Sequence, residues 1–329
     1  MKRRILWIAA LLLGSMNLAH AVADTVRVGV LEFGTVNWEL EVIRSQELAK
    51  KRGLDLVVVP LASGDASTVA LQGGSVDVIV SDWLWVSRQR ADGNLFSFVT
   101  YSNAVGALVV PAQSDIKTIA DLKGKKIGIS GGPNDKIWTL LRAHSLRNHG
   151  VDLAKAATPT FAAPPLLNEL AQRRQVDASL NTWPYTARLL AKGMHELVGL
   201  PDILAGIGVN QPIPLIGWVF KEDWANKNKN LLNKFLDASS QAKAIMKNSD
   251  DVWNTLKSKM KAEDDTIFFN LRNTFRAGIP GCMSDMTLKN MALTQKTLYE
   301  LGGEKLVGKA DKITDGTFWA GHDTACLIQ

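Results

Sequence analysis

Two polar-aromatic triplets stand one hundred residues apart in this chain. Ser81-Asp82-Trp83 and Asn181-Thr182-Trp183 each follow an apolar stretch that predicts a β-strand. In doubly wound sheets, ligands bind beyond the carboxyl ends of the strands, against helix N-termini whose free N–H groups favour anions. The triplets are therefore candidates for ligand contact, and we expect Trp83 and Trp183 to form opposite walls of one site. The chemistry predicted is recognition of a small molecule, without bond making.

Two loops that follow predicted strands extend this candidate site. The loop after the first strand contributes Thr35, Asn37 and Trp38, and its counterpart a hundred residues later contributes Gly132 and Asn134. Gly132 precedes a proline, which fits a helix start whose backbone donors point at a cleft. We therefore expect these five residues to contact the same ligand.

Each candidate also has a plainer structural interpretation. A tryptophan is often core packing, Asp82 can simply cap the helix that follows it, and a glycine pair at 131 and 132 can be a tight turn. Arg88 and Arg188 lie within the predicted helices, where they face solvent or brace their part of the fold. The sequence leaves these alternatives open.

The elements that must position these residues occur twice. Residues 70–93 align without a gap on residues 170–193, and VRVGV at 26–30 resembles KKIGI at 125–129. A repeat of about one hundred residues predicts two similar α/β lobes rather than a solenoid. A cleft between two lobes is a usual place for a small ligand.

Alternating strands and helices fill both copies. Residues 25–31, 54–59 and 76–80 predict strands, separated by helices at 36–52 and 68–72, and the second copy repeats this order with strands at 125–129 and 177–180 around a helix at 135–148. This order predicts doubly wound, mostly parallel sheets, with crossing strands at 108–111 and 215–220 forming a hinge. Helices are expected at 231–246, 252–260, 267–274 and 288–301. Lobe one is then 22–108 plus 215–329 with these C-terminal helices, and lobe two is 109–214.

The first residues predict export. Lys2-Arg3-Arg4 precedes a short apolar stretch, and Ala19-His20-Ala21 is a small-x-small cleavage site, so a signal peptide should end at residue 21, or alternatively at 23. The residue directly after the cleavage site is not a cysteine, which argues against a lipid anchor. We expect a soluble periplasmic protein. In that oxidising compartment Cys282 and Cys326 are expected to form a disulfide that holds the C-terminal tail.

Composition excludes several classes of function. Removal of the signal lowers the 38 basic residues to 35 against 32 acidic ones, and this near balance gives no case for nucleic acid. The five histidines show no catalytic or metal-ligand spacing. We expect a monomer that is not an enzyme and has no cofactor and no metal site.

Several motifs resemble the nitrate/sulfonate/taurine (NitT/TauT-type) group of ABC-importer solute-binding proteins. They are VGVL at 28–31, SVDVIVSDWLWVSRQR at 75–90, IADLKGKKIGISGGPND at 119–135 and the Trp-Pro pair at 183–184. The resemblance implies a two-lobed type II periplasmic-binding-protein fold and transient contact with an ABC permease in the inner membrane.

The sequence determines the identity of the ligand less well than the class of protein. Helix N-termini favour a sulfonate or carboxylate, the tryptophans favour a ring or apolar portion, and Asp82 beside them could favour a cation. We expect a small organic anion with an apolar or ring portion. Two alternatives remain: an exported accessory protein that binds a partner protein through a cleft blocked by its own side chains, and an enzyme similar to thiamine pyrimidine synthases. The second is disfavoured because the chain carries a signal peptide and lacks a cysteine-rich cluster.

Overall fold

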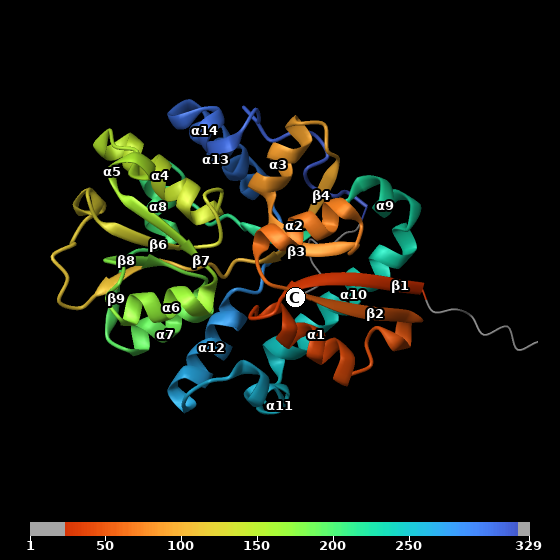
Figure 1. The fold of residues 1–329 in the computed structure, drawn as a ribbon. Coiled ribbons are helices and arrows are strands. Elements are labelled where there is room, and N and C mark those ends of the chain that lie inside the picture. The colour runs from red at the N-terminus through yellow and green to blue at the C-terminus, as the bar shows by residue number, and fades with distance from the viewer. Residues whose placement is uncertain (1–23, 322–329) are drawn as a thin grey trace, which may run out of the picture.

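The computed structural model describes residues 24–321, which form two lobes, each built on a five-stranded sheet (Figure 1). The predicted signal peptide and Cys326 lie outside these residues, so the disulfide with Cys282 stays a prediction. The sheet of lobe one has the spatial order β2 (Leu54–Leu61), β1 (Asp24–Leu31), β3 (Val78–Asp82), β10 (Ile216–Lys221), β4 (Phe96–Ser102). The sheet of lobe two has the order β7 (Thr158–Ala162), β6 (Lys126–Ser130), β8 (Ala178–Leu180), β5 (Leu108–Pro111), β9 (Met194–Val198).

The two sheets correspond strand for strand, as the repeat predicts. In lobe one β1 pairs in parallel with β2 and β3, and in lobe two β6 pairs in parallel with β7 and β8. The fourth strand of each sheet, β10 or β5, is antiparallel to both of its neighbours. These are the two strands reached after the chain has crossed between the lobes. The fold class is therefore confirmed.

Helices cover both sheets. Those of lobe one are α1 (Val36–Ser45), η1 (Lys50–Arg52), α2 (Gly64–Gly73), α3 (Trp83–Ala91), α9 (Glu222–Lys227) and α10 (Lys229–Asn248). Those of lobe two are η2 (Ile119–Leu122), α4 (Lys136–His149), α5 (Leu153–Ala156), α6 (Pro164–Gln172), α7 (Trp183–Ala191) and α8 (Leu200–Gly206). The C-terminal helices are α11 (Asp251–Met260), α12 (Asp265–Ala277), α13 (Asp285–Gly302) and α14 (Glu304–Val307). No helix within residues 24–321 is long and apolar enough to cross a membrane.

The helix expected at 36–52 is interrupted. α1 ends at Ser45, Glu47 adopts a left-handed φ of 52°, and the short helix η1 follows. The turn returns Leu48 and Ala49 to the core, where they are 2% and 7% exposed. Burial of these two apolar side chains explains why the chain turns before Gly53.

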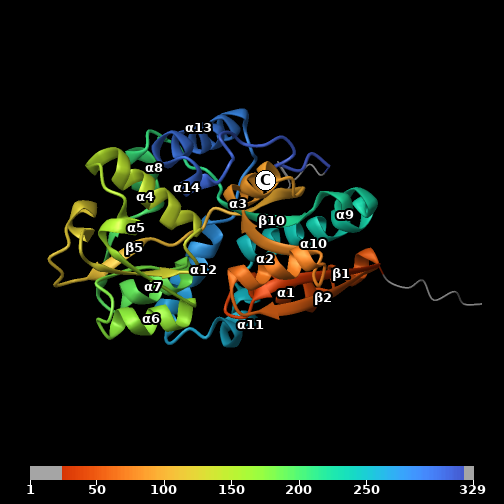
Figure 2. The ribbon, with the colours of Figure 1, turned by 45° about the horizontal axis from the view of Figure 1, so that its top comes forward.

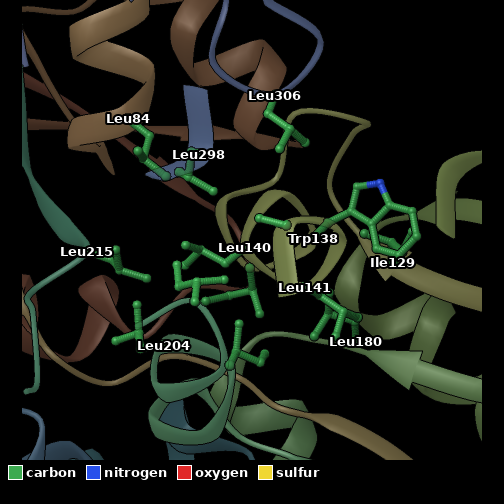
Figure 3. Close-up of a cluster of buried hydrophobic side chains, with 14 of the residues drawn as sticks. Leu84, Ile129, Trp138, Leu140, Leu141, Leu180, Leu204, Leu215, Leu298 and Leu306 are labelled. Atoms are coloured by element: carbon green, nitrogen blue, oxygen red, sulfur yellow. The ribbon is translucent and has the colours of Figure 1, made fainter. Parts of the chain in front are cut away.

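The C-terminal helices lie on both sides of the junction between the lobes (Figures 1 and 2). α13 packs against α4 of lobe two and α14 against α3 of lobe one, whereas α11 packs against α1 and α12 against α7. One apolar cluster consequently runs through both lobes, joining Leu84 to Leu140 by way of Leu298 and Leu306 (Figure 3). The helices were predicted from their apolar periodicity, but this bridging was not.

Candidate functional site

A small cavity of about 40 Å³ lies where the two lobes meet. It is room for on the order of three water molecules. Its lining comes from the first crossing and from β10 on one side, and from the carboxyl ends of β6 and β8 with the starts of α4 and α7 on the other. The lining residues are Ala104, Val105, Gly106, Ile216, Ser130, Asp135, Lys136, Ile137, Leu180, Asn181, Thr182 and Trp183. The cavity thus lies where ligands of doubly wound sheets are expected.

Lobe two supplies the polar part of this lining. Ser130 ends β6 and is only 7% exposed, yet its hydroxyl makes no hydrogen bond with any residue in 24–321. Thr182 precedes α7 and provides no side-chain cap to that helix. Neither hydroxyl is occupied by another described residue, so the Ser130 and Thr182 side chains are available to a ligand.

Lys136 gives the cavity a positive charge. Its Nζ lies 3.6 Å from Oδ2 of Asp135, and its side chain is 21% exposed. Burial works against the charged form, but the carboxylates of Asp135 and Asp82 outweigh burial and raise the pKa of Lys136. The amine is therefore protonated at neutral pH, and within residues 24–321 its ion pair is the loose one with Asp135.

Two helix starts that were expected to bind an anion are already occupied by the protein. Asp82 Oδ1 accepts a hydrogen bond from the Trp85 N–H at the start of α3. Asp135 Oδ1 accepts bonds from the N–H groups of Ile137 and Trp138 at the start of α4. Asp82 therefore caps α3, as the structural interpretation of this residue predicted. The start of α7 is different, because it has no side-chain cap and Thr182 and Trp183 line the cavity.

The expected pairing of Trp83 with Trp183 is not found. Trp183 lines the cavity and packs edge-on against Trp38 of α1, with ring centroids 5.9 Å apart. Trp83 is fully buried and donates its Nε1 hydrogen to the Pro214 carbonyl at 3.0 Å. The return crossing lies over Trp83 and holds it in the core, so Trp38 rather than Trp83 faces Trp183 across the lobes.

The other candidates surround the cavity without lining it. Asn37 donates to the carbonyls of Leu31 and Gly34, which fixes the loop after β1. The Asn134 carbonyl accepts from Arg88 of lobe one. Of the predicted set, the structure brings three to the cavity wall (Asn181, Thr182, Trp183) and places the rest elsewhere (Thr35, Asn37, Trp38, Ser81, Asp82, Trp83, Gly132, Asn134).

Sequence reasoning missed Ser130, Lys136 and the first crossing, Ala104 to Gly106. Ser130 directly follows the strand predicted at 125–129, but Gly132 and Asn134 of the next few residues were chosen instead. Lys136 comes just after that loop, so extending the same argument by one helical turn would have found it. The repeat gives no signal for residues 104–106, because these residues connect the two copies and have no counterpart that could be aligned with them.

The two lobes and their sheet order define a periplasmic-binding-protein fold. Comparison with solved structures finds the same fold. A Bordetella bronchiseptica protein superposes with a TM-score of 0.75 at 19% identity over 90% of this chain and 94% of the other. The alkanesulfonate-binding protein SsuA from Xanthomonas axonopodis pv. citri, bound to MOPS, gives 0.69 at 18% identity over 90% and 98%. The aliphatic sulphonate binding protein SsuA from Escherichia coli gives 0.68 at 21% identity over 90% and 97%.

Sequence comparison assigns the family. The model described as NMT1/THI5 like matches residues 48–251, so the chain belongs to the NMT1/THI5-like family. This confirms the resemblance that the motifs carry. The L-cystine-binding protein TcyJ of Escherichia coli (strain K12) is 32% identical over 99 residues, 30% of this chain. The match spans only 36% of that curated relative.

Proposed function

We propose that this protein is the periplasmic solute-binding component of an ABC importer and captures a small organic anion with an apolar or ring portion between its lobes. The observation that carries the proposal is the group of polar side chains that line the interlobe cavity and can bond a ligand: the Ser130 and Thr182 hydroxyls, which bond no other described residue, and the Lys136 ammonium, whose ion pair with Asp135 is 3.6 Å long. An alkanesulfonate, the ligand class in the name of one structural relative, is such an anion, and L-cystine, named for another relative, is a zwitterion that shares the carboxylate group.

The cavity favours an anion whose charged group rests on lobe two. Ser130 and Thr182 can donate hydroxyl hydrogens, Lys136 supplies the opposite charge, and the first turn of α7 directs its dipole toward the same space. Apolar atoms of the ligand would contact Ile216 from lobe one and the Trp183 indole. Lobe two then binds the charge, and lobe one and the crossing cover the apolar portion.

A ring-bearing ligand needs more space than the cavity offers here. Ligand pockets of that kind usually hold about 300 Å³ or more, whereas this cavity measures about 40 Å³. The lobes must therefore separate to admit the ligand and stand further apart when it is bound. Ligand would enter and leave unchanged, because the protein binds rather than transforms it, and delivery would need only transient contact of the monomer with the permease.

Thermal unfolding of the mature chain against alkanesulfonates, carboxylates, heterocycles and quaternary amines tests this function. A ligand at 100 times its dissociation constant stabilises the native state by about 2.7 kcal/mol. Stabilisation by one anionic class supports the proposal. If only cations stabilise, the ligand class is wrong, and if nothing in the panel does, the accessory-protein alternative becomes the better hypothesis.

Substitutions then locate the site with the compound that gave the largest shift. Lys136→Met should weaken binding by about tenfold or more, since a hydrogen bond to a charged group is worth ~1.5–3 kcal/mol. Trp183→Ala should weaken it about fivefold. Lys192→Met, on the exposed end of α7, is the matched control. Unchanged affinity in both site variants, measured by titration calorimetry, would place the ligand elsewhere.

A further inference from the structure

We infer that Arg188 is a positioning residue that latches lobe two to the C-terminal helices of lobe one and so limits how far the cavity opens. The inference concerns regulation of the site proposed above and rests on that function for its purpose. The latch itself is a property of the unliganded chain, so it can be tested without a ligand.

The guanidinium of Arg188 joins α7 of lobe two to the segment that connects α11 and α12. Its Nη2 donates to the Met260 carbonyl at 3.0 Å and to the Lys261 carbonyl at 3.3 Å, and its Nε lies 3.2 Å from both carboxylate oxygens of Glu263. These acceptors lie at the end of α11 and in the turn before α12, and α11 packs on α1 of lobe one. A cation at the carboxyl end of a helix also interacts favourably with its dipole.

The same side chain holds the wall of the cavity. Arg188 Nη1 donates to the Pro184 carbonyl at 2.8 Å, within the first turn of α7 and one residue after Trp183. Trp183 in turn contacts Trp38 of lobe one. Arg188 therefore fixes the start of α7, and with it Trp183, against lobe one, although Arg188 does not line the cavity.

The opposite side of the junction has a different character. There α13 packs against α4, and the buried Met291 belongs to the apolar cluster that runs through both lobes. Leu298 and Leu140 of the same cluster are shown in Figure 3. Separating these side chains would expose apolar surface to water.

The α7 side also has apolar contacts, because Trp183 lies in the cluster that contains Trp38 and α12 packs against α7. It differs in the added polar bonds of Arg188, whose partner Glu263 is 47% exposed and can be replaced by water. We therefore expect the lobes to pivot on the α13 side and to part on the α7 side once these bonds are removed.

The chain contains a matched control for this latch. Arg276 of α12 also donates to two backbone carbonyls, those of Met246 and Ser249, and pairs with the carboxylate of Asp250. These partners lie at the end of α10 and in the turn before α11, so the bonds tie α12 to lobe one and include no residue of lobe two, although α12 itself packs against α7. Arg276→Gln removes the same chemistry as Arg188→Gln without removing a bond to α7.

Distances between spin labels measure the effect in the ligand-free mature chain. One pair of labelled non-canonical residues at exposed positions 51 (η1) and 192 (end of α7) spans the latch side, and a second pair at 155 (α5) and 296 (α13) spans the pivot side. Arg188→Gln should move the first distance to longer values and broaden it, and leave the second unchanged. Arg276→Gln should change neither.

Equal distance distributions for wild type and Arg188→Gln would overturn the inference, as would the same lengthening in Arg276→Gln. If Arg188→Gln does not fold, Glu263→Gln removes only the half-exposed partner and should lengthen the first distance in the same direction; an unchanged distance then overturns the latch. Because no ligand is added, failure of the latch leaves the proposed function standing, and failure of the ligand panel leaves the latch standing.

Discussion

Asp82 and Asp135 place two carboxylates at the junction between the lobes. Each caps the helix that it precedes, and Asp82 lies near enough to Lys136 and Arg88 to feel both charges. Burial raises the pKa of Asp82, and these two cations oppose the increase without cancelling it. Asp82 therefore costs stability when ionised, while it places a carboxylate beside the ligand cavity.

Asp82→Asn should stabilise the protein at neutral pH. The folded-state pKa of Asp82 is raised, so the native state binds this proton more tightly than the unfolded state does. The stability gained from protonated Asp82 is therefore lost as pH rises through the folded pKa. Asparagine keeps an oxygen for the Trp85 N–H but has no charge to desolvate. In urea unfolding at several pH values, the gain over wild type should be largest above that pKa and should shrink toward acid pH.

Asp121→Asn is the control of opposite sign. Hydrogen bonds from Lys117 and Thr118 lower the pKa of Asp121, so its contribution is present at neutral pH and lost as pH falls through the folded pKa. This variant should lose stability at neutral pH and converge on wild type in acid. A pH-independent gain for Asp82→Asn would contradict the desolvation argument.

The sequence predicts where a residue lies along a strand or helix when the two copies of the repeat can be aligned. It put Trp83 and Trp183 at corresponding ends of β3 and β8, and both do begin helices there. It could not give their surroundings, because the return crossing covers Trp83 whereas the first crossing leaves Trp183 at the cavity. Those contacts join residues far apart in sequence, which a local pattern does not record.

At the scale of elements, the first crossing is the tightest contact between the hinge and lobe two. A Cβ added to Gly106 would lie 1.6 Å from the Asn181 carbonyl oxygen, in the strand-end triplet that lines the cavity. No side chain can be accommodated there unless the backbone moves. Glycine at this position lets the crossing close the cavity.

Gly106→Ala should therefore destabilise the protein by ~1–3 kcal/mol, the range for overpacking, and weaken ligand binding as the crossing is displaced. Gly64→Ala provides the comparison, because a methyl group there meets open space at the start of α2. Denaturant unfolding gives the first quantity and ligand titration the second. Wild-type behaviour of Gly106→Ala in both would show that the crossing can shift at no cost.

Element positions were predicted better than element partners. The four C-terminal helices expected at 231–301 correspond to α10 through α13, since apolar periodicity marks a buried face whatever covers it. The same periodicity does not say what the face packs against. α13 therefore proved to pack on α4 of lobe two, although the sequence had grouped these helices with lobe one.

At the scale of the whole molecule, the C-terminal helices give the two lobes a shared apolar core. Leu298 of α13 is fully buried in the cluster that contains Leu84 of lobe one and Leu140 of lobe two (Figure 3). A shared core couples the unfolding of its parts, because neither lobe can lose it alone without exposing the other's apolar surface. Hinge motion must then occur without breaking this cluster, which is consistent with a pivot on the α13 side.

Leu298→Ala should lower the free energy of unfolding by about 2–5 kcal/mol, the usual cost of a buried leucine, and should move the whole transition. Leu293→Ala on the same helix is the control, since Leu293 is 43% exposed and should change stability by no more than ~0.5 kcal/mol. Scanning calorimetry should give one transition, with equal calorimetric and van't Hoff enthalpies, in wild type and both variants. Two transitions, of which Leu298→Ala shifts only one, would mean that the lobes unfold separately and that α13 stabilises one of them alone.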